Sequence, residues 1–319
     1  MTDDKPVNFR HSAVAFALAT LLLACTIAPA RARVIAVGPH RALKLPSEAA
    51  AAARDGDTIE IDTGTYRDCS VWRASGLTIE AHGPNVTIAG RPCFERGLFI
   101  VAGANTTIRG LTFEGAHGAW HNAAGILGLG DNLTVVNSRF SDNENGILAT
   151  GTAAGQVHVH DSTFEGNGSC EGACAHAVYV GSPIALLEVS GNRFLGTRTA
   201  HSVKSRARST IVAHNEIADG ETGSSSYLID IPNGGDVLIE HNDLQKGAGS
   251  SNREVAISIG EEPARNPPGA LIVRDNRFVS ALPDGTIFVR NATPVTAILS
   301  GNTLEGKVVA LAGPGAVAP

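Results

Sequence analysis

Short apolar segments with nearly identical endings recur along most of this chain. LTVVNSRF, LEVSGNRF and LIVRDNRF are three of eight such segments, and each alternates apolar with polar residues as a strand with one buried face does. The intervals between their last apolar residues are 27, 24, 30, 23, 27, 34 and 26 residues, a spacing typical of a solenoid. These last residues are Phe113, Phe140, Phe164, Phe194, Ile217, Leu244, Phe278 and Leu304.

A second short apolar strand follows each ending, for example GILGL, HAVYV and VAISI. No amphipathic helix of about 10–15 residues separates the strands, which disfavours a βαβ fold. The pattern therefore predicts an all-β coil of parallel strands joined by Gly/Asn turns. The longest interval, which contains PARNPPG, predicts a protruding loop.

Asparagine stands two residues before the last apolar position in five of the eight endings. Asparagine tolerates left-handed backbone and bonds nearby backbone groups through its side chain. Stacked on successive turns, these side chains could form a ladder inside the coil. They could equally be turn formers only, and both interpretations give the same fold. The five are Asn192, Asn215, Asn242, Asn276 and Asn302.

The segment PSEAAAAARDGDTIEI precedes the first turn. Alanines are strong helix formers, Ser47 is a suitable N-cap, and Gly56 is expected to end the helix. A solenoid needs a cover over the open end of its core. We therefore predict a capping helix here.

The first 32 residues have the pattern of a signal peptide. Lys5 and Arg10 precede the apolar run SAVAFALATLLLAC, and Ala30-Arg31-Ala32 is a small-residue cleavage site. We expect residues 1–32 to be removed, leaving a β-helix domain over 33–319 in the periplasm or outside the cell. Leu22-Leu23-Ala24-Cys25 also resembles a lipobox, so a lipoprotein anchored through Cys25 and an uncleaved anchor are the alternatives. No later stretch approaches the ~18 apolar residues of a membrane span.

Composition excludes several classes of protein. With 36 glycines, 43% hydrophobic and 18% charged residues, the chain fits neither a disordered protein nor a coiled coil. Residues 33–319 keep 22 of the 25 basic and 29 of the 31 acidic residues, so the mature balance is −7. Nonspecific nucleic-acid binding needs clustered positive charge, so we expect no nucleic-acid partner.

Four cysteines remain after residue 32, and an even number in an exported chain predicts disulfides. The short CEGAC loop favours Cys170–Cys174, which leaves Cys69 to pair with Cys93. A zinc site is the alternative, but the chain has no CxxC pair, and we predict no metal site.

The capping segment followed by DGDTIEIDTGTY and the repeated xGNxF endings resemble the right-handed parallel β-helix superfamily, which includes pectate-lyase-like polysaccharide enzymes. The resemblance covers nearly all of 34–312 and implies one right-handed β-helix, which we expect to have about nine turns. DCSVWR, ENGILA and HSVKSRA more narrowly resemble exported bacterial right-handed β-helix proteins. The likeness to pectate lyases also implies that calcium is a possible cofactor, although no acidic cluster points to it; otherwise we expect none.

Aligning HAVYVGS, HSVKSRA and YLIDIPN places polar side chains of three turns in two columns. One column holds His176, His201 and Tyr227; the other holds Tyr179, Lys204 and Asp230. If Val178, Val203 and Ile229 point inward, Tyr179, Lys204 and Asp230 point outward, because strand side chains alternate. Arg206 faces the same way, with Arg198 and Arg208 nearby in sequence.

These columns favour a lyase acting on an acidic, uronic-acid-containing polysaccharide. Lys204 is the expected base, Arg206 the group that neutralises the substrate carboxylate, and Tyr179 or His201 the proton donor. HSVKSRA resembles the lysine-bearing strand of β-helix alginate and chondroitin lyases, although the next turn offers Asp230 where that family has arginine. An epimerase would use the same proton abstraction. The expected substrate-binding residues are His176, Asp230, Tyr227, Asn122 and Asn233.

Two other functions remain open. A glycoside hydrolase needs two carboxylates ~5–9.5 Å apart, and Asp230 could pair with Glu144, Glu171 or Glu254. A non-catalytic surface or carbohydrate-binding protein would use Lys204–Asp230 as a surface ion pair. In each case we expect a monomer.

Overall fold

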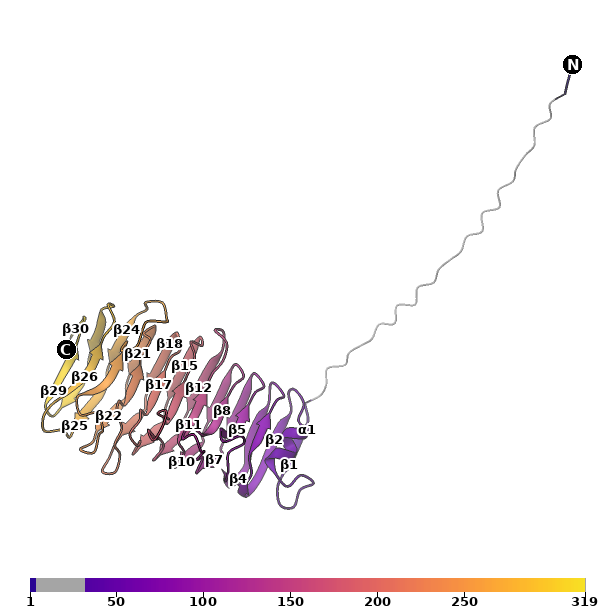
Figure 1. Cartoon of the computed structure of the whole chain (residues 1–319), viewed down its shortest axis with the longest axis horizontal. Coiled ribbons are helices and arrows are strands. Elements are labelled where there is room, and N and C mark those ends of the chain that lie inside the picture. The colour runs from indigo at the N-terminus through magenta and orange to yellow at the C-terminus, as the bar shows by residue number, and fades with distance from the viewer. Residues whose placement is uncertain (4–31, 319) are drawn as a thin grey trace. The chain divides into compact units, whose positions relative to one another are not determined.

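The computed structural model describes residues 1–3 and 32–318, and Ala32–Pro319 form one compact unit (Figure 1). The expected signal peptide and Cys25 lie outside the described residues, apart from residues 1–3 and Ala32. Within the described part, no helix has the length and apolar character needed to span a membrane.

The unit is a parallel β-solenoid built from two sheets. The first sheet has ten strands, one from each successive turn. It consists of β3 (Ser70–Trp72), β5 (Gly97–Val101), β8 (Ala124–Gly128), β11 (Asn145–Ala149), β14 (Val178–Val180), β17 (Val203–Ser205), β20 (Ile229–Ile231), β23 (Val255–Ile259), β26 (Thr286–Asn291) and β29 (Val308–Ala312).

The second sheet has twenty strands and covers the other faces of the coil. Each strand of a turn pairs in parallel with the corresponding strand of the next turn. It consists of β1 (Val34–Val37), β2 (Thr58–Arg67), β4 (Thr78–Ala89), β6 (Thr106–Arg109), β7 (Thr112–Glu114), β9 (Leu133–Val136), β10 (Arg139–Ser141), β12 (Gln156–His160), β13 (Thr163–Glu165), β15 (Leu186–Ser190), β16 (Arg193–Leu195), β18 (Ser209–Ala213), β19 (Glu216–Ala218), β21 (Asp236–Glu240), β22 (Asp243–Lys246), β24 (Leu271–Arg274), β25 (Arg277–Ser280), β27 (Ala297–Ser300), β28 (Thr303–Glu305) and β30 (Gly315–Val317).

The all-β solenoid prediction is confirmed, but the coil has about eleven turns rather than nine. The turns that the sequence pattern did not predict lie mainly at the N-terminal end and contain β1, β2 and β4. β4 runs on through the bend and pairs with both β6 and β7. These first turns lack the repeated asparagine-containing ending, so the repeat pattern did not count them.

The repeated endings stack in register along the coil, which fills its core. Phe113 pairs with Phe140, and Phe140 with Phe164, in neighbouring turns. The rings from Phe113 to Phe194 stack with centroids 5.2, 4.7 and 4.6 Å apart, and all four side chains are buried. Burial of these rings and of the Val/Ile/Leu rows beside them removes apolar surface from water on every turn.

The asparagines form a ladder, which is one of the two arrangements that the sequence left open. Asn215 Oδ1 accepts hydrogen bonds from the backbone N–H of Asn192, at 2.9 Å, and from its side-chain amide, at 3.0 Å. Asn242 Oδ1 does the same for Asn215, and the pattern continues to Asn302. Each rung thus satisfies a buried backbone donor at a bend where no strand partner is available.

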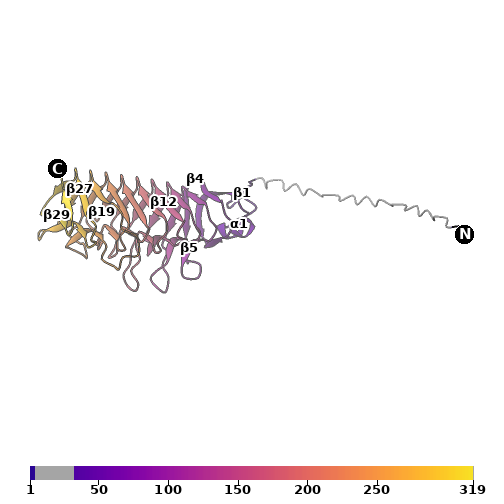
Figure 2. The same ribbon diagram turned by 90° about the horizontal axis from the view of Figure 1, so that it is seen from above.

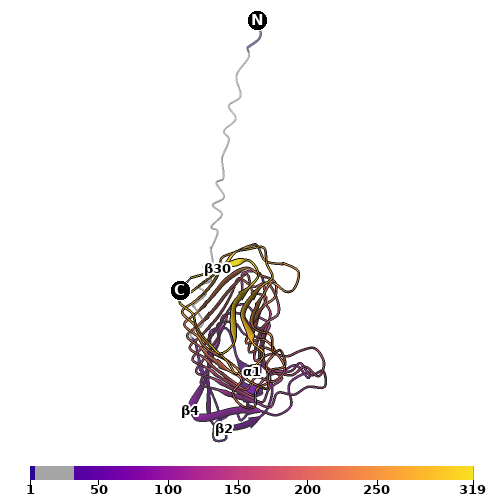
Figure 3. The same ribbon diagram turned by 90° about the vertical axis from the view of Figure 1, so that its left-hand side faces the viewer.

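The predicted capping helix is present as α1 (Pro46–Ala52), but its limits differ from the prediction. Its N-cap is Leu45 rather than Ser47, because Pro46 occupies the first turn and the Glu48 carboxylate accepts the backbone N–H groups of Lys44 and Leu45. Its C-cap is Ala53, three residues before Gly56. Ala49 is buried in the core, and α1 lies over the N-terminal end of the coil (Figures 1 and 3).

Both predicted disulfides are present, Cys69–Cys93 and Cys170–Cys174. The first links the segment between β2 and β3 to the segment between β4 and β5, across neighbouring turns. The second closes a loop before β14. The longest loops project from one side of the coil, the side on which β5 lies, whereas the opposite side is regular (Figure 2).

Candidate functional site

A column of outward side chains crosses neighbouring strands of the ten-stranded sheet. Tyr179 on β14 pairs in register with Lys204 on β17, which pairs with Asp230 on β20. Val178 and Val203 beside them are fully buried, as strand alternation requires. The predicted order of the column is therefore confirmed. We call Tyr179, Lys204, Arg206, Asp230 and Glu262 the polar column.

Lys204 lies between two carboxylates. Its Nζ is 2.9 Å from Asp230 Oδ2 and 3.6 Å from Glu262 Oε1. The Asp230 side chain is only 4% exposed, and this burial raises its pKa despite the attraction of Lys204. Asp230 is therefore a better proton acceptor than an ordinary surface carboxylate.

Arg206 joins Tyr179 to Glu262. Its guanidinium donates to both carboxylate oxygens of Glu262, at 2.6 and 2.7 Å, and to the phenol oxygen of Tyr179. The pKa of Glu262 is held below its usual value by Arg206 and Lys204, against the cost of partial burial. Because Tyr179 accepts this bond, its own hydroxyl proton remains free for another partner.

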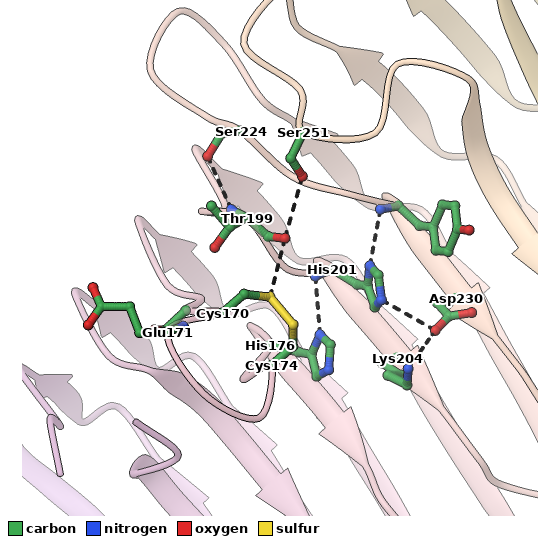
Figure 4. Close-up of a disulfide and its surroundings, with 12 residues drawn as sticks. Cys170, Glu171, Cys174, His176, Thr199, His201, Lys204, Ser224, Asp230 and Ser251 are labelled. Atoms are coloured by element: carbon green, nitrogen blue, oxygen red, sulfur yellow. Dashed lines mark hydrogen bonds and ion pairs between the residues drawn. A yellow bond between two sulfur atoms is a disulfide. The ribbon is translucent and has the colours of Figure 1, made fainter. Parts of the chain in front are cut away.

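A second column of side chains, behind the polar column, contains the two predicted histidines, His176 and His201, and fixes their orientation. His176 Nδ1 accepts the backbone N–H of His201, and His201 Nδ1 accepts that of Tyr227, each at 3.1 Å. The rings stack at 4.7 and 5.0 Å, and Figure 4 shows His201 directed toward Asp230, with its Nε2 3.4 Å from Oδ2. We call His176, His201 and Tyr227, with Asn145 before them, the imidazole ladder.

The ladder keeps both imidazoles neutral. An Nδ1 that accepts a backbone N–H has no free lone pair for a proton, so the hydrogen sits on Nε2. Burial, with the positive charge of Lys204 nearby, lowers the pKa of His201 to about 3. Burial also lowers the pKa of His176 well below its usual value. His201 thus presents a neutral Nε2–H donor to Asp230 at physiological pH.

Tyr227, at the end of the ladder, is bound to a further charged group. Its hydroxyl donates to Glu261 Oε2 at 2.6 Å, and burial together with this bond raises its pKa to about 12. Arg290 donates to Glu261 at 3.1 Å and to Glu254 at 3.2 Å. Glu254, one of the expected hydrolase carboxylates, is thus paired with Arg290.

Glu261 and Glu262 were not predicted as site residues. They begin the long loop between β23 and β24 that the 34-residue interval indicated. Asn266 fixes this loop, because its amide donates to the carbonyls of Ala207 and Gly234 at 2.9 and 3.0 Å. Asn233 also supports the loop through a bond to the carbonyl of Pro263, and its side chain is buried. The interval length was the only sequence signal for these residues.

Asn122 lies at the N-terminal end of the imidazole ladder. Its Oδ1 accepts the amide of Asn145, and Asn145 Oδ1 accepts the backbone N–H of His176 at 2.8 Å. Asn122 is therefore in line with the imidazole ladder and two turns before His176.

A cavity of about 550 Å³ lies among the loops beside these turns. Buried Glu144 accepts the backbone N–H of Ala123 at 2.6 Å, and its other oxygen lies 3.5 Å from His121 Nδ1. Glu171 also contacts His121, at 3.4 Å. Glu144 precedes β11, three strands from Asp230 and thus roughly 14 Å away at ~4.8 Å per strand, beyond the spacing of a glycosidase pair.

The carboxylates of the polar column and of the neighbouring Glu261 are all paired with cationic side chains. Asp230 and Glu262 each contact Lys204 or Arg206, and Glu261 contacts Arg290. Oxygen ligands for a calcium ion would have to be released from these pairs first. Calcium remains an expectation from sequence only.

The comparisons with known proteins concern the fold. Residues 47–194 match the family described as a right handed beta helix region. No curated protein sequence matches the chain significantly. An alginate lyase from Paenibacillus sp. str. FPU-7 is 18% identical, with 87% of this chain and 99% of that chain covered and a TM-score of 0.59.

Two further solved structures are more distant. A pectin methylesterase from Aspergillus niger is 15% identical, covers 88% of this chain and 91% of its own, and has a TM-score of 0.45. A pectin methylesterase from Erwinia chrysanthemi is 9% identical, covers 88% and 80%, and has a TM-score of 0.34. The comparison with the alginate lyase shows a shared fold, and the activity has to be argued from the site.

Proposed function

We propose that this right-handed parallel β-helix protein is a polysaccharide lyase that cleaves uronic-acid polymers by β-elimination. The observation that carries the proposal is that Tyr179 pairs in register with Lys204 on the next turn and accepts a hydrogen bond from Arg206. The shared fold with an alginate lyase is consistent with it but does not assign the reaction.

β-Elimination needs three groups, and the polar column offers one for each. In this proposal Lys204 takes the proton from C5 of the uronate, Arg206 binds the carboxylate on which negative charge develops, and Tyr179 gives its proton to the leaving oxygen. The C4–O bond breaks as the C4–C5 double bond forms. The new ammonium and phenolate then exchange the proton, so the site returns to its starting state.

Asp230 and His201 prepare Lys204 for this role. Asp230 Oδ2 lies 2.9 Å from Lys204 Nζ and holds the amine beside Tyr179 and Arg206. The neutral Nε2–H of His201 lies 3.4 Å from the same carboxylate and holds it in place. Both are therefore positioning residues in this proposal.

The substrate carboxylate takes the place of Glu262 on Arg206. The Glu262 side chain is 37% exposed and lies at the start of a loop. The Arg206 side chain is only 16% exposed and lies at the end of strand β17. A carboxylate arriving from solvent meets the same two-pronged guanidinium that Glu262 now occupies. The two disulfides fit action outside the cytoplasm, which we include in the proposal.

The test measures the ultraviolet absorbance of unsaturated products when the protein is mixed with a panel of uronic-acid polymers. We expect Lys204→Ala and Tyr179→Phe to reduce the rate about 100-fold or more, as loss of a general base or acid does. Lys307→Ala, at an exposed turn, is the matched control and should keep full activity. The proposal fails if no polymer gives an unsaturated product, or if Lys204→Ala matches the wild type.

One observation favours a glycoside hydrolase as the second candidate. Asp230 and Glu262 both approach Lys204 Nζ, at 2.9 and 3.6 Å, so the two oxygens are at most 6.5 Å apart. Their pKa values are shifted in opposite directions, which is typical of an acid and base pair. Release of reducing ends without a double bond, lost in Glu262→Gln, would identify this reaction. Inversion at C5 without cleavage would identify an epimerase.

A further inference from the structure

We propose that His158, His160 and Glu188 form a binding site for one divalent transition-metal ion, with Zn²⁺ as the best-suited ion. The site lies on the outer face of the twenty-stranded sheet, on β12 and β15, and uses none of the residues of the polar column. It is independent of the proposed lyase activity.

The strand geometry brings the three side chains to one face. His158 and His160 are two residues apart on β12, so both point the same way. Val157 and Val159, which alternate with them, are buried, so the imidazoles point outward. Glu188 pairs in register with His158 on the next turn. Rigid strand backbone therefore positions all three groups.

The ligand atoms are already close together. His158 Nδ1 is 3.0 Å from Glu188 Oε2, and one ligand atom from each of the three residues lies within 4.8 Å of the other two. Tetrahedral zinc, with bonds of about 2.0–2.2 Å, needs roughly 3.3 Å between ligand atoms. His158 and Glu188 are 24% and 31% exposed, so side-chain rotation can close the remaining gap.

Neighbouring oxygens orient both rings for metal binding. His158 Nε2 contacts Gln156 Oε1 at 3.1 Å, and His160 Nδ1 contacts Ser190 Oγ at 2.6 Å. When these nitrogens donate their hydrogens, His158 Nδ1 and His160 Nε2 keep free lone pairs. Metal-binding histidines usually have such an outer hydrogen-bond partner on the second nitrogen.

The charge around the site leaves Glu188 available to a cation. In the part of the chain that the structure describes, its only ion-pair partner is His158. The residues in register on the flanking strands are uncharged: Thr134, Val136, Ile211 and Ala213. Imidazole with carboxylate is a donor set that suits zinc, and three protein ligands leave one position for water.

The test is calorimetric titration of the chelator-treated full chain with Zn²⁺. We expect one ion per chain, with affinity reduced about tenfold or more in His158→Ala, His160→Ala and Glu188→Gln, and a Zn²⁺-dependent rise in the melting temperature that is smaller in these three variants than in the wild type. Melting in the absence of metal shows whether each variant is folded.

Two control variants separate this site from other histidines. His214 and His241 also stack on neighbouring turns, at 5.0 Å, so His214→Ala should bind Zn²⁺ like the wild type. His121→Ala tests the loop cluster with Glu144 and Glu171, and it too should bind normally. The proposal is overturned if no stoichiometric binding occurs, or if binding survives Glu188→Gln and is lost in His121→Ala.

Discussion

A histidine in the imidazole ladder accepts the same backbone hydrogen bond as an asparagine. Asn Oδ1 and His Nδ1 are both attached to Cγ and both accept the backbone N–H of the next turn. Asn145 does so for His176, and His176 for His201, at 2.8 and 3.1 Å. The fold therefore needs an acceptor at this position, and the choice of imidazole adds only a neutral Nε2–H on the outer side.

This equivalence gives a pH prediction for His201→Asn. The folded pKa of His201 is about 3, below the ~6.5 of an unfolded histidine, so the unfolded state takes up the proton first on acidification. The stabilisation is complete above about pH 6.5 and is lost as pH falls toward 3, by up to ~1.4 kcal/mol per pH unit. Asparagine keeps the acceptor and does not titrate, so the variant should lose less stability on acidification.

Urea unfolding at pH 7, 5.5 and 4 measures this difference. His241→Asn, at an exposed turn, serves as the control and should keep the wild-type pH dependence. Equal pH slopes in the wild type and His201→Asn would show that His201 is not held neutral.

The residues of the site were predictable where they lie on strands. The alignment of three repeats placed Tyr179 next to Lys204 and Lys204 next to Asp230, because register is set by the apolar pattern. Glu262 was not predictable, because it reaches Arg206 from 56 residues away through a loop. The fold of that loop depends on Asn266, whose contacts follow no local pattern.

At the scale of an element, each turn depends on one side chain from the next. Asn215 accepts the backbone N–H and amide of Asn192, and its own amide donates to the carbonyls of Val189 and Ala213. The repeats indicated that this ladder was one of two arrangements, since all five asparagines occupy equivalent positions. The limits of α1 were harder to predict, since the Glu48 carboxylate and Pro46 move the N-cap to Leu45.

Asn215→Ala should therefore destabilise the protein by about 2–3 kcal/mol, because a buried N–H and two carbonyls lose partners. The free energy of unfolding from urea denaturation measures the loss. Asn302→Ala, near the C-terminal end and less buried, should cost clearly less. An equal loss at both positions would contradict a role for burial in the ladder.

At the scale of the molecule, contacts run between neighbouring turns, so covalent links between turns matter. The Cys69–Cys93 disulfide closes a separation of 24 residues near the capped end, whereas Cys170–Cys174 closes a separation of 4 within one loop. Parallel pairing, the stacked core and the solenoid class were all predictable from the repeats. The turn count was not, because the first turns lack the repeated ending.

Replacing both Cys69 and Cys93 by serine should lower stability by about 3.5 kcal/mol, and replacing both Cys170 and Cys174 by about 2 kcal/mol, since the entropy of a closed loop grows with its length. Thermal melts of both double variants, with reduced wild type beside them, check the order. The reverse order would show that the short loop supports more of the fold than its length implies.

The imidazole ladder also has a consequence for how such a site arises. Because asparagine and histidine fill the same acceptor position, a single substitution can exchange one for the other without removing the bond that the turn requires. A polar surface can thus be assembled on an existing coil one turn at a time, while each turn keeps its hydrogen-bond acceptor. The repeats of this molecule thus supply equivalent positions at which a polar side chain can be exchanged while the hydrogen bond between turns is kept.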